Sequence, residues 1–216
     1  MPQERICMKR VVVTVARQYG SGGREIGERV AELLGIPKYD KEFVTLAANQ
    51  DETVCAEALE KVDERATNSL LYTLAVGSNL FGISPGGAPS LPLNDKLFVL
   101  QSSIIRQKAD EESCVMIGRC ADYVLRDRPE RLAVFVYADL EERKRRVSVR
   151  HGITEGQAVD VINKTDRRRA SYYNFYTGGK WGKFDNYDIA INSACLGIEG
   201  TARVIADMAR EKMKEE

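Results

Sequence analysis

The stretch VVVTVARQYGSGGREIG, residues 11–27, decides the fold that we expect of this 216-residue chain. Residues 11–16 form an unbroken apolar run, which is typical of a strand buried on both faces of a parallel sheet. Residues 22–34 then repeat apolar side chains at helical spacing, and Gly35 and Pro37 supply the stop signals. The sequence therefore predicts a buried strand that passes through a glycine-rich turn into a helix.

A glycine-rich turn at this place is suited to binding phosphate. Glycines let backbone N–H groups converge on anionic oxygens, and the helix N-terminus adds a favourable potential. The standard motif GxxxxGK[ST] would require Gly at position 18, Lys at 24 and Ser or Thr at 25. The chain has Gln18, Arg24 and Glu25 there, and Gly23 alone keeps its expected place. We expect residues 20–24 to wrap a phosphate, with Arg24 forking across two oxygens; the alternative is a tight turn without a ligand.

A dinucleotide site is a second interpretation of the same turn. The motif GxGxxG is matched at Gly20 and Gly22 but would need a third glycine where Glu25 stands. Asp40 follows about 20 residues after the turn, where such proteins place the acid that binds the ribose. A dinucleotide-dependent oxidoreductase therefore stays open at this point.

The rest of the chain alternates between short apolar runs and helical periodicity. Further strands are expected at residues 36–40, 114–117, 132–137 and 189–191, and helices at residues 41–75, 96–111, 139–150, 154–171 and 198–214. Asp139 and Thr154 are the expected N-caps, and Gln157 completes a capping box with Thr154. Residues 77–93, rich in glycine and proline, and the aromatic residues 172–188 read as loops. This alternation predicts an α/β fold, a parallel sheet of about five strands flanked by helices.

Composition narrows the class of protein. The 32 basic and 32 acidic residues cancel, so broad attraction to a nucleic-acid polymer or a membrane is not expected. No apolar run approaches a membrane span, and the first ten residues lack a signal-peptide core. The five cysteines are scattered without a CxxC pair, which predicts packed thiols and a cytoplasmic location. A single histidine, His151, argues against a histidine metal site or a catalytic triad.

Several arginines are candidates for the chemistry. Arg119 follows the apolar run 114–117, and the carboxyl ends of strands are where α/β sheets bind ligands. It can clamp a phosphate there, or pair at the surface with Asp122 or Asp127. The basic runs 143–146 and 167–169 can stabilise the charge that develops in phosphoryl transfer, or they are solvated helix faces.

Two other features leave alternatives open. Asp40 can hold a base, a ribose or an arginine, or it is the N-cap of a helix. The aromatic side chains of residues 172–187 can stack on a base, or they pack locally.

Six short stretches together resemble a known family. They occur in the order ARQYGSGGREIG, YDKE, IGRCADYVL, VFVYADLEERKRR, DRRRASYY and YDIAIN, and the resemblance covers about residues 10–208. This ordered set is similar to the cytidylate kinase-like family, a divergent branch of the P-loop nucleoside monophosphate kinases. The resemblance implies a single P-loop NTPase domain over residues 1–216 with an adenylate-kinase-like core. Residues 41–107 would be a helical substrate-binding insert and residues 143–185 a lid.

The resemblance also implies roles for particular residues. The residues placed on the ATP phosphates are Gly20, Ser21, Gly22, Gly23, Arg24, Glu25 and Ile26. Catalytic roles fall to Arg24 at the P-loop lysine position, to Arg119, and to the lid arginines Arg167 and Arg169. The acceptor would be bound by Asp40, Arg119 and Asp122.

Two departures from the family pattern bear on metal and specificity. Glu25 and Ile26 stand where such kinases carry Gly-Thr, so the hydroxyl that helps to hold Mg²⁺ is missing and the metal ligands are unknown. Ser21 is a candidate substitute. Cys120 stands in place of the aspartate that reads the nucleotide, which leaves cytidine specificity open.

The preferred hypothesis is therefore an ATP- and Mg²⁺-dependent small-molecule kinase. Its acceptor is expected to be a nucleoside monophosphate, cytidylate-like, or a related molecule. The partners are then nucleotide substrates, and a homodimer stays open. The alternative is a non-catalytic nucleotide-binding or sensor protein with a degenerate P-loop.

Overall fold

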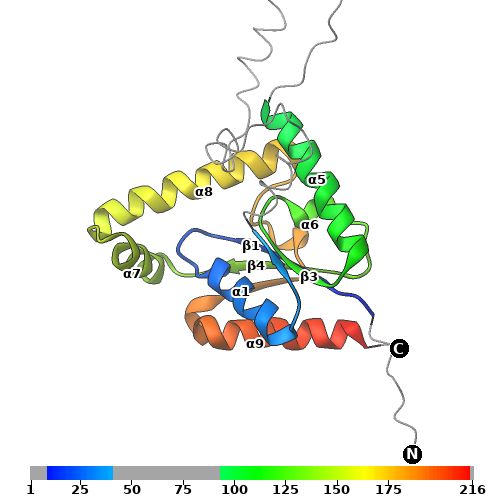
Figure 1. Ribbon diagram of the computed structural model, residues 1–216. Coiled ribbons are helices and arrows are strands. Elements are labelled where there is room, and N and C mark those ends of the chain that lie inside the picture. Colours follow the sequence, from blue (N-terminus) through cyan, green and yellow to red (C-terminus); the bar gives the residue numbers. More distant parts are fainter. Residues whose placement is uncertain (1–8, 41–92, 215–216) are drawn as a thin grey trace, which may run out of the picture.

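The computed structural model describes residues 9–40 and 93–214, so the expected helix at 41–75 and the loop at 77–92 lie outside the described residues. Five parallel strands form one sheet in the order β2-β3-β1-β4-β5 (Figure 1). The strands are β1 (Val12–Arg17), β2 (Lys38–Tyr39), β3 (Cys114–Ile117), β4 (Arg131–Tyr137) and β5 (Ile189–Asn192). The predicted parallel sheet flanked by helices is thus confirmed.

Strand β1 is central because its side chains are apolar on both faces. Val13 and Val15 pack into the core on one face of the sheet, and Val12 packs into the core on the other. Val13 lies in register with Val115 of β3 and with Leu132 of β4. Burial on both faces explains why the sequence shows an unbroken apolar run here rather than an alternating one.

Helices cover both faces of this sheet (Figure 1). Helices α1 (Gly23–Leu34) and α9 (Ser193–Met213) lie on one face, where Ile26 and Ile205 are fully buried. Helices α5 (Leu93–Glu111) and α6 (Ala121–Val124) lie on the other, where Ile105 is fully buried. Apolar burial from both sides therefore fixes the ends of β1, β3 and β4 in space, and the candidate site is built at those ends.

Helices α7 (Leu140–His151) and α8 (Glu155–Thr177) form a hairpin beside the turn that follows β1 (Figure 1). The predicted capping box is confirmed, because the Gln157 amide donates to Thr154 Oγ1 and the Gln157 side chain contacts the Thr154 N–H. Asp139 does precede α7 as its N-cap residue. Its side chain makes no capping hydrogen bond to the described residues, so that part of the prediction is wrong.

The predicted loop at residues 172–188 begins too early. Helix α8 continues through Thr177 and ends at Gly178, which has φ 67°. Tyr176 stacks on Phe98 of α5 with ring centroids 4.2 Å apart. Aromatic packing between α8 and α5 therefore extends the helix by almost two turns beyond the predicted end.

The last strand leads directly into the last helix. Helix α9 begins at Ser193, but Gly197 interrupts its helical geometry with φ 66° and ψ −176°. The regular part therefore starts near Ile198, where the sequence predicts it. The short helix η1 (Phe184–Asn186) lies in the loop before β5.

Candidate functional site

The turn between β1 and α1 presents backbone donors at the start of a helix. Gly20 and Gly22 have φ values of 78° and 77°, a left-handed conformation that glycine adopts without strain. Gly22 is the N-cap of α1 and has no side chain with which to cap it. The first N–H groups of a helix lack acceptors within the helix, so this N-terminus is suited to binding an anion.

Gly23 allows the side chain of Arg17 to cross the start of α1. A Cβ atom at position 23 would lie 3.0 Å from Arg17 Cγ and closer still to Arg17 Cβ. Arg17, to which no sequence motif assigns a role, lines the cleft above the turn. The signal was available, since Arg17 directly follows the apolar run and ends β1 at the edge where α/β sheets bind ligands.

Among the described residues, five arginines line one cleft of about 400 Å³ above the glycine turn: Arg17, Arg24, Arg119, Arg150 and Arg169. The carboxylates in this described lining are Glu25 and Asp40. Such an excess of guanidinium groups favours an anionic ligand with several oxygens, because each fork can bridge two of them.

Two of these arginines form ion pairs with the two carboxylates. Arg24 Nε lies 3.0 Å from Asp40 Oδ2, and Arg150 of α7 pairs with Glu25 of α1. The side chains of Arg24 and Arg150 are 50% and 52% exposed, so these pairs add little stability. Asp40 therefore contacts Arg24 at the start of α1, directly after the glycine turn.

Arg119 reaches the cleft through an unusual turn after β3. Gly118, Arg119 and Cys120 have consecutive φ values of 76°, 58° and 54°, so two residues other than glycine are left-handed. Such a backbone is costly and is typical of functional sites. Arg119 is only 8% exposed. It lines the cleft and also a second hollow behind it.

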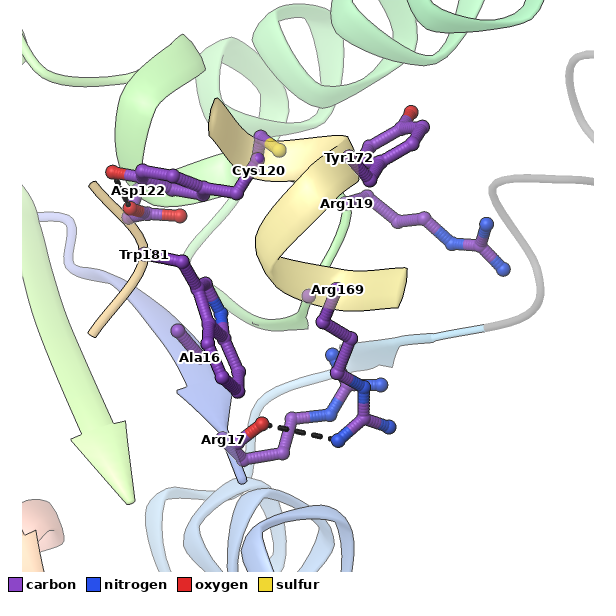
Figure 2. Close-up of a pocket in the computed structure, with 10 residues that line it drawn as sticks. Ala16, Arg17, Arg119, Cys120, Asp122, Arg169, Tyr172 and Trp181 are labelled. Atoms are coloured by element: carbon purple, nitrogen blue, oxygen red, sulfur yellow. Dashed lines mark hydrogen bonds between the residues drawn. The ribbon is translucent and has the colours of Figure 1, made fainter. Parts of the chain in front are cut away.

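This second hollow shares Arg17, Arg119 and Arg169 with the cleft. Figure 2 shows Arg169 reaching from α8 to the end of β1, where Arg169 Nη1 donates to the Arg17 carbonyl over 3.0 Å. Trp181 lies between Asp122 and Arg17 in the same view. These three arginines line both hollows and are termed the shared wall, although Figure 2 shows the guanidinium group of Arg119 extending away from Asp122 and Trp181.

The inner end of the second hollow carries a buried carboxyl group. Asp122 is 4% exposed, and the Tyr173 hydroxyl donates to its Oδ2 over 2.9 Å. Burial raises the pKa of Asp122 to about 6, although the bond from Tyr173 acts in the opposite direction. Cys120 is 6% exposed and packs with Tyr172 and Tyr173.

The arginines of the two basic runs differ in whether they line a hollow or support the glycine turn. Arg167 is exposed and is not among the described residues that line either hollow. Arg143 Nη1 donates to Asp166 Oδ2 over 2.6 Å, and Arg146 Nη1 donates to the Ser21 carbonyl over 2.8 Å. Arg143 and Arg146 therefore hold the glycine turn from α7, a role that a run of charges in a sequence does not reveal.

A third hollow, about 540 Å³, opens beside the turn between α7 and α9. Its lining includes Gly22, Arg146 and Arg150 on one side and Gly197 and Ile198 on the other. A hollow lined by arginines, an apolar side chain and glycine backbone suits a planar ring.

Within residues 9–40 and 93–214, no helix has the length and apolarity needed to cross a membrane.

Solved structures that are similar to this chain include the following two. The crystal structure of an uncharacterized protein from Eubacterium ventriosum is 26% identical with a TM-score of 0.67, covering 93% of this chain and 98% of that chain. The crystal structure of shikimate kinase from Bacteroides thetaiotaomicron is 14% identical with a TM-score of 0.50, covering 92% and 97%, a likeness of fold alone. No curated protein matches the sequence.

The sequence profile of the cytidylate kinase-like family matches residues 12–194, from the first buried strand to the start of α9. This range contains the glycine turn, Arg119 and Arg169. The resemblance seen in the six short stretches is thus confirmed, together with the fold of the P-loop kinases. The chain belongs to the cytidylate kinase-like family.

Proposed function

We propose that this protein is an ATP-dependent small-molecule kinase that transfers the γ-phosphoryl group to a nucleoside monophosphate or a related acceptor. The observation that carries the proposal is the shared wall of Arg17, Arg119 and Arg169 between the cleft and the second hollow. A phosphoryl group that passes between a donor and an acceptor needs cations at the boundary between their sites.

The donor triphosphate is assigned to the glycine turn. The backbone of Gly20, Gly22 and Gly23 would surround its phosphates, and Arg24 would take the position of the P-loop lysine. The adenine and ribose are assigned to the hollow between α7 and α9, where Arg150 and Ile198 flank the space for a planar ring.

The anionic group of the acceptor is assigned to the second hollow. This hollow has a volume of about 20 Å³, so the remainder of the acceptor would lie outside it. Arg119 would bind its anionic group, and Asp122 would accept a hydrogen bond from a hydroxyl or amino group. The aromatic side chains of Tyr172 and Trp181 supply flat apolar surface beside these polar groups. Asp40 is the less favoured acceptor residue, because it is paired with Arg24 on the donor side.

Positioning and electrostatics would carry the reaction. The transition state spreads negative charge over the equatorial oxygens, and Arg119 and Arg169 can stabilise that charge from the shared wall. Residues 143–185 are proposed as the lid that excludes water, and residues 41–107 as the acceptor-binding insert. Mg²⁺ is expected to enter bound to the phosphates of ATP. The cytoplasmic location and the homodimer stay predictions.

A coupled assay of ADP release over a panel of nucleoside and sugar monophosphates tests the kinase. We expect turnover with at least one acceptor in the presence of Mg²⁺, and we expect the Arg169→Ala variant to lose most of it. Absence of turnover with every acceptor at high enzyme concentration would refute the kinase.

A nucleotide-binding protein without transferase activity is the second candidate. Glu25 and Ile26, which replace the metal-holding hydroxyl of a P-loop, favour it. ATP binding without any phosphoryl transfer would support this candidate over the kinase.

A further inference from the structure

The residue that would normally help to hold the metal is part of the core. Ile26 is fully buried on α1, and its N–H group donates to the Gly22 carbonyl over 2.9 Å. Position 26 therefore offers neither a hydroxyl group nor a free donor to the cleft.

Ser21, the candidate substitute for that hydroxyl, is turned into the protein. It is fully buried, and its Oγ donates to the Gln18 carbonyl over 2.9 Å. The carbonyl of Ser21 in turn accepts from Arg146 over 2.8 Å and from Ser193 over 2.5 Å. These bonds fix the shape of the turn, so moving Ser21 toward a metal would dismantle the phosphate cradle itself.

The carboxylates of the cleft already have cationic partners. Glu25 pairs with Arg150, and Asp40 pairs with Arg24. Mg²⁺ prefers oxygen ligands from carboxylates and water, and an arginine competes directly for the same oxygens. The described residues hold no group of three or more His, Cys, Asp or Glu side chains that suits a metal ion.

The described part of the cleft lining carries an excess of positive charge. Within residues 9–40 and 93–214, five arginines and two carboxylates line the cleft, a formal charge of +3 for this part of the lining. Arg24 reaches Asp40 through Nε, and a guanidinium has four further N–H donors with which to bind phosphate at the same time. Carboxylates that orient arginines, rather than ligate a metal, account for both ion pairs.

We infer that the donor site neutralises the triphosphate with arginine side chains, and that residues 9–40 and 93–214 supply no side-chain ligand to Mg²⁺. The nucleotide and water would then hold the ion without a ligand from this part of the chain. This inference rests on the proposed function, because it assumes that ATP binds at the glycine turn. Glu25, which departs from the P-loop motif, then acts as the counter-charge that orients the side chain of Arg150.

The affinity for ATP should depend on whether Mg²⁺ is bound to the nucleotide. Metal-free ATP carries about two more negative charges than its Mg²⁺ complex, and a cleft of excess positive charge attracts it more strongly. A site that ligates the metal must show the opposite preference. We therefore expect metal-free ATP to bind at least as tightly as the Mg²⁺ complex.

Isothermal titration calorimetry of the full chain with ATP, in EDTA and in Mg²⁺, tests this expectation. If the Mg²⁺ complex binds at least about tenfold more tightly than metal-free ATP, a difference of about 1.4 kcal/mol, the inference is wrong. The proposed kinase function would not be contradicted by that result. Absence of ATP binding under both conditions would instead contradict the assignment of the donor site and thus the proposed function.

The Glu25→Gln variant distinguishes a counter-charge at position 25 from a metal ligand. Because it removes one negative charge from the cleft, it should bind metal-free ATP about threefold more tightly and bind the Mg²⁺ complex of ATP no more weakly than the wild type. Glu32→Gln is the matched control, because Glu32 lies on the same helix, is paired with Arg29 and does not line the described cleft. Selective loss of the Mg²⁺ complex in Glu25→Gln, but not in Glu32→Gln, would identify Glu25 as a metal ligand and refute the inference.

Discussion

The backbone N–H of Tyr19 donates to Oδ1 of Asp166 over 2.7 Å, so the glycine turn is hydrogen-bonded to the middle of helix α8. The other oxygen of Asp166 accepts from Arg143 over 2.6 Å, and Arg143 also donates to the Tyr19 carbonyl over 3.3 Å. One carboxylate thereby joins α7, α8 and the turn. The proposed lid is attached at its base to the loop that is assigned to the donor phosphates.

We predict that Asp166→Ala destabilises the protein by about 2 kcal/mol, because it leaves a largely buried Arg143 and the Tyr19 N–H without their acceptor. The side chains of Arg143 and Asp166 are 11% and 17% exposed, so water replaces the lost partner poorly. Urea unfolding measures the loss. The exposed Asp160 on the same helix is the control, and equal losses in Asp160→Ala and Asp166→Ala would contradict the prediction.

Asp122 predicts a particular dependence of stability on pH. Its pKa is raised from 3.8 to about 6, so the folded state binds this proton more tightly than the unfolded chain does. The contribution of Asp122 to stability is therefore fully present below about pH 4 and is lost as pH rises to about 6. Compared with Asp122→Asn, the wild type should lose about 2 kcal/mol of unfolding free energy between about pH 4 and pH 7. A constant difference between the two proteins over that range would show that the carboxyl group is not buried.

Local patterns in the sequence predicted the frame of the site. The apolar run that ends at Ile117 gave a strand with the bounds observed, and the strand end then placed Arg119 at the ligand-binding edge of the sheet. The glycines after β1 predicted the helix N-terminus for the same reason. Each of these inferences depends on residues that are adjacent in the chain.

Contacts between distant segments were not predictable in this way. The sequence does not show that Glu25 meets Arg150, nor that Tyr176 stacks on Phe98, which extends α8 through a segment composed like a loop. Nor does a run of basic residues reveal which of them are buried. Arg143 bonds to Asp166 and Arg146 bonds to the Ser21 carbonyl, so both support the glycine turn. Arg167, to which the resemblance gives a catalytic role, is exposed.

Arg167 and Arg169 are therefore expected to differ sharply. Arg169 lines the cleft, and a charge-assisted hydrogen bond to phosphate lost in Arg169→Ala should weaken ATP binding about tenfold. Arg167→Ala should change it less than about twofold, because an exposed charge outside the cleft is screened by salt. Calorimetry of both variants checks this order. A larger effect of Arg167→Ala would mean that the lid closes further on the nucleotide and brings Arg167 into the site.

The close approach of Arg17 to α1 predicts the effect of adding one methyl group. In Gly23→Ala the new Cβ would overlap Arg17 Cβ and approach Val136 Cβ at 3.3 Å, so the turn or the arginine must shift. We expect a loss of about 2 kcal/mol in unfolding free energy, and weaker ATP binding because the phosphate cradle is displaced. Gly156→Ala is the control, since a Cβ there meets nothing within 4 Å at the start of α8. That variant should be stabilised by about 0.5 kcal/mol through the lower entropy of its unfolded chain. If Gly23→Ala proved as stable as Gly156→Ala and bound ATP normally, Arg17 would not lie across the helix start, and its place on the wall between the two hollows would have to be abandoned.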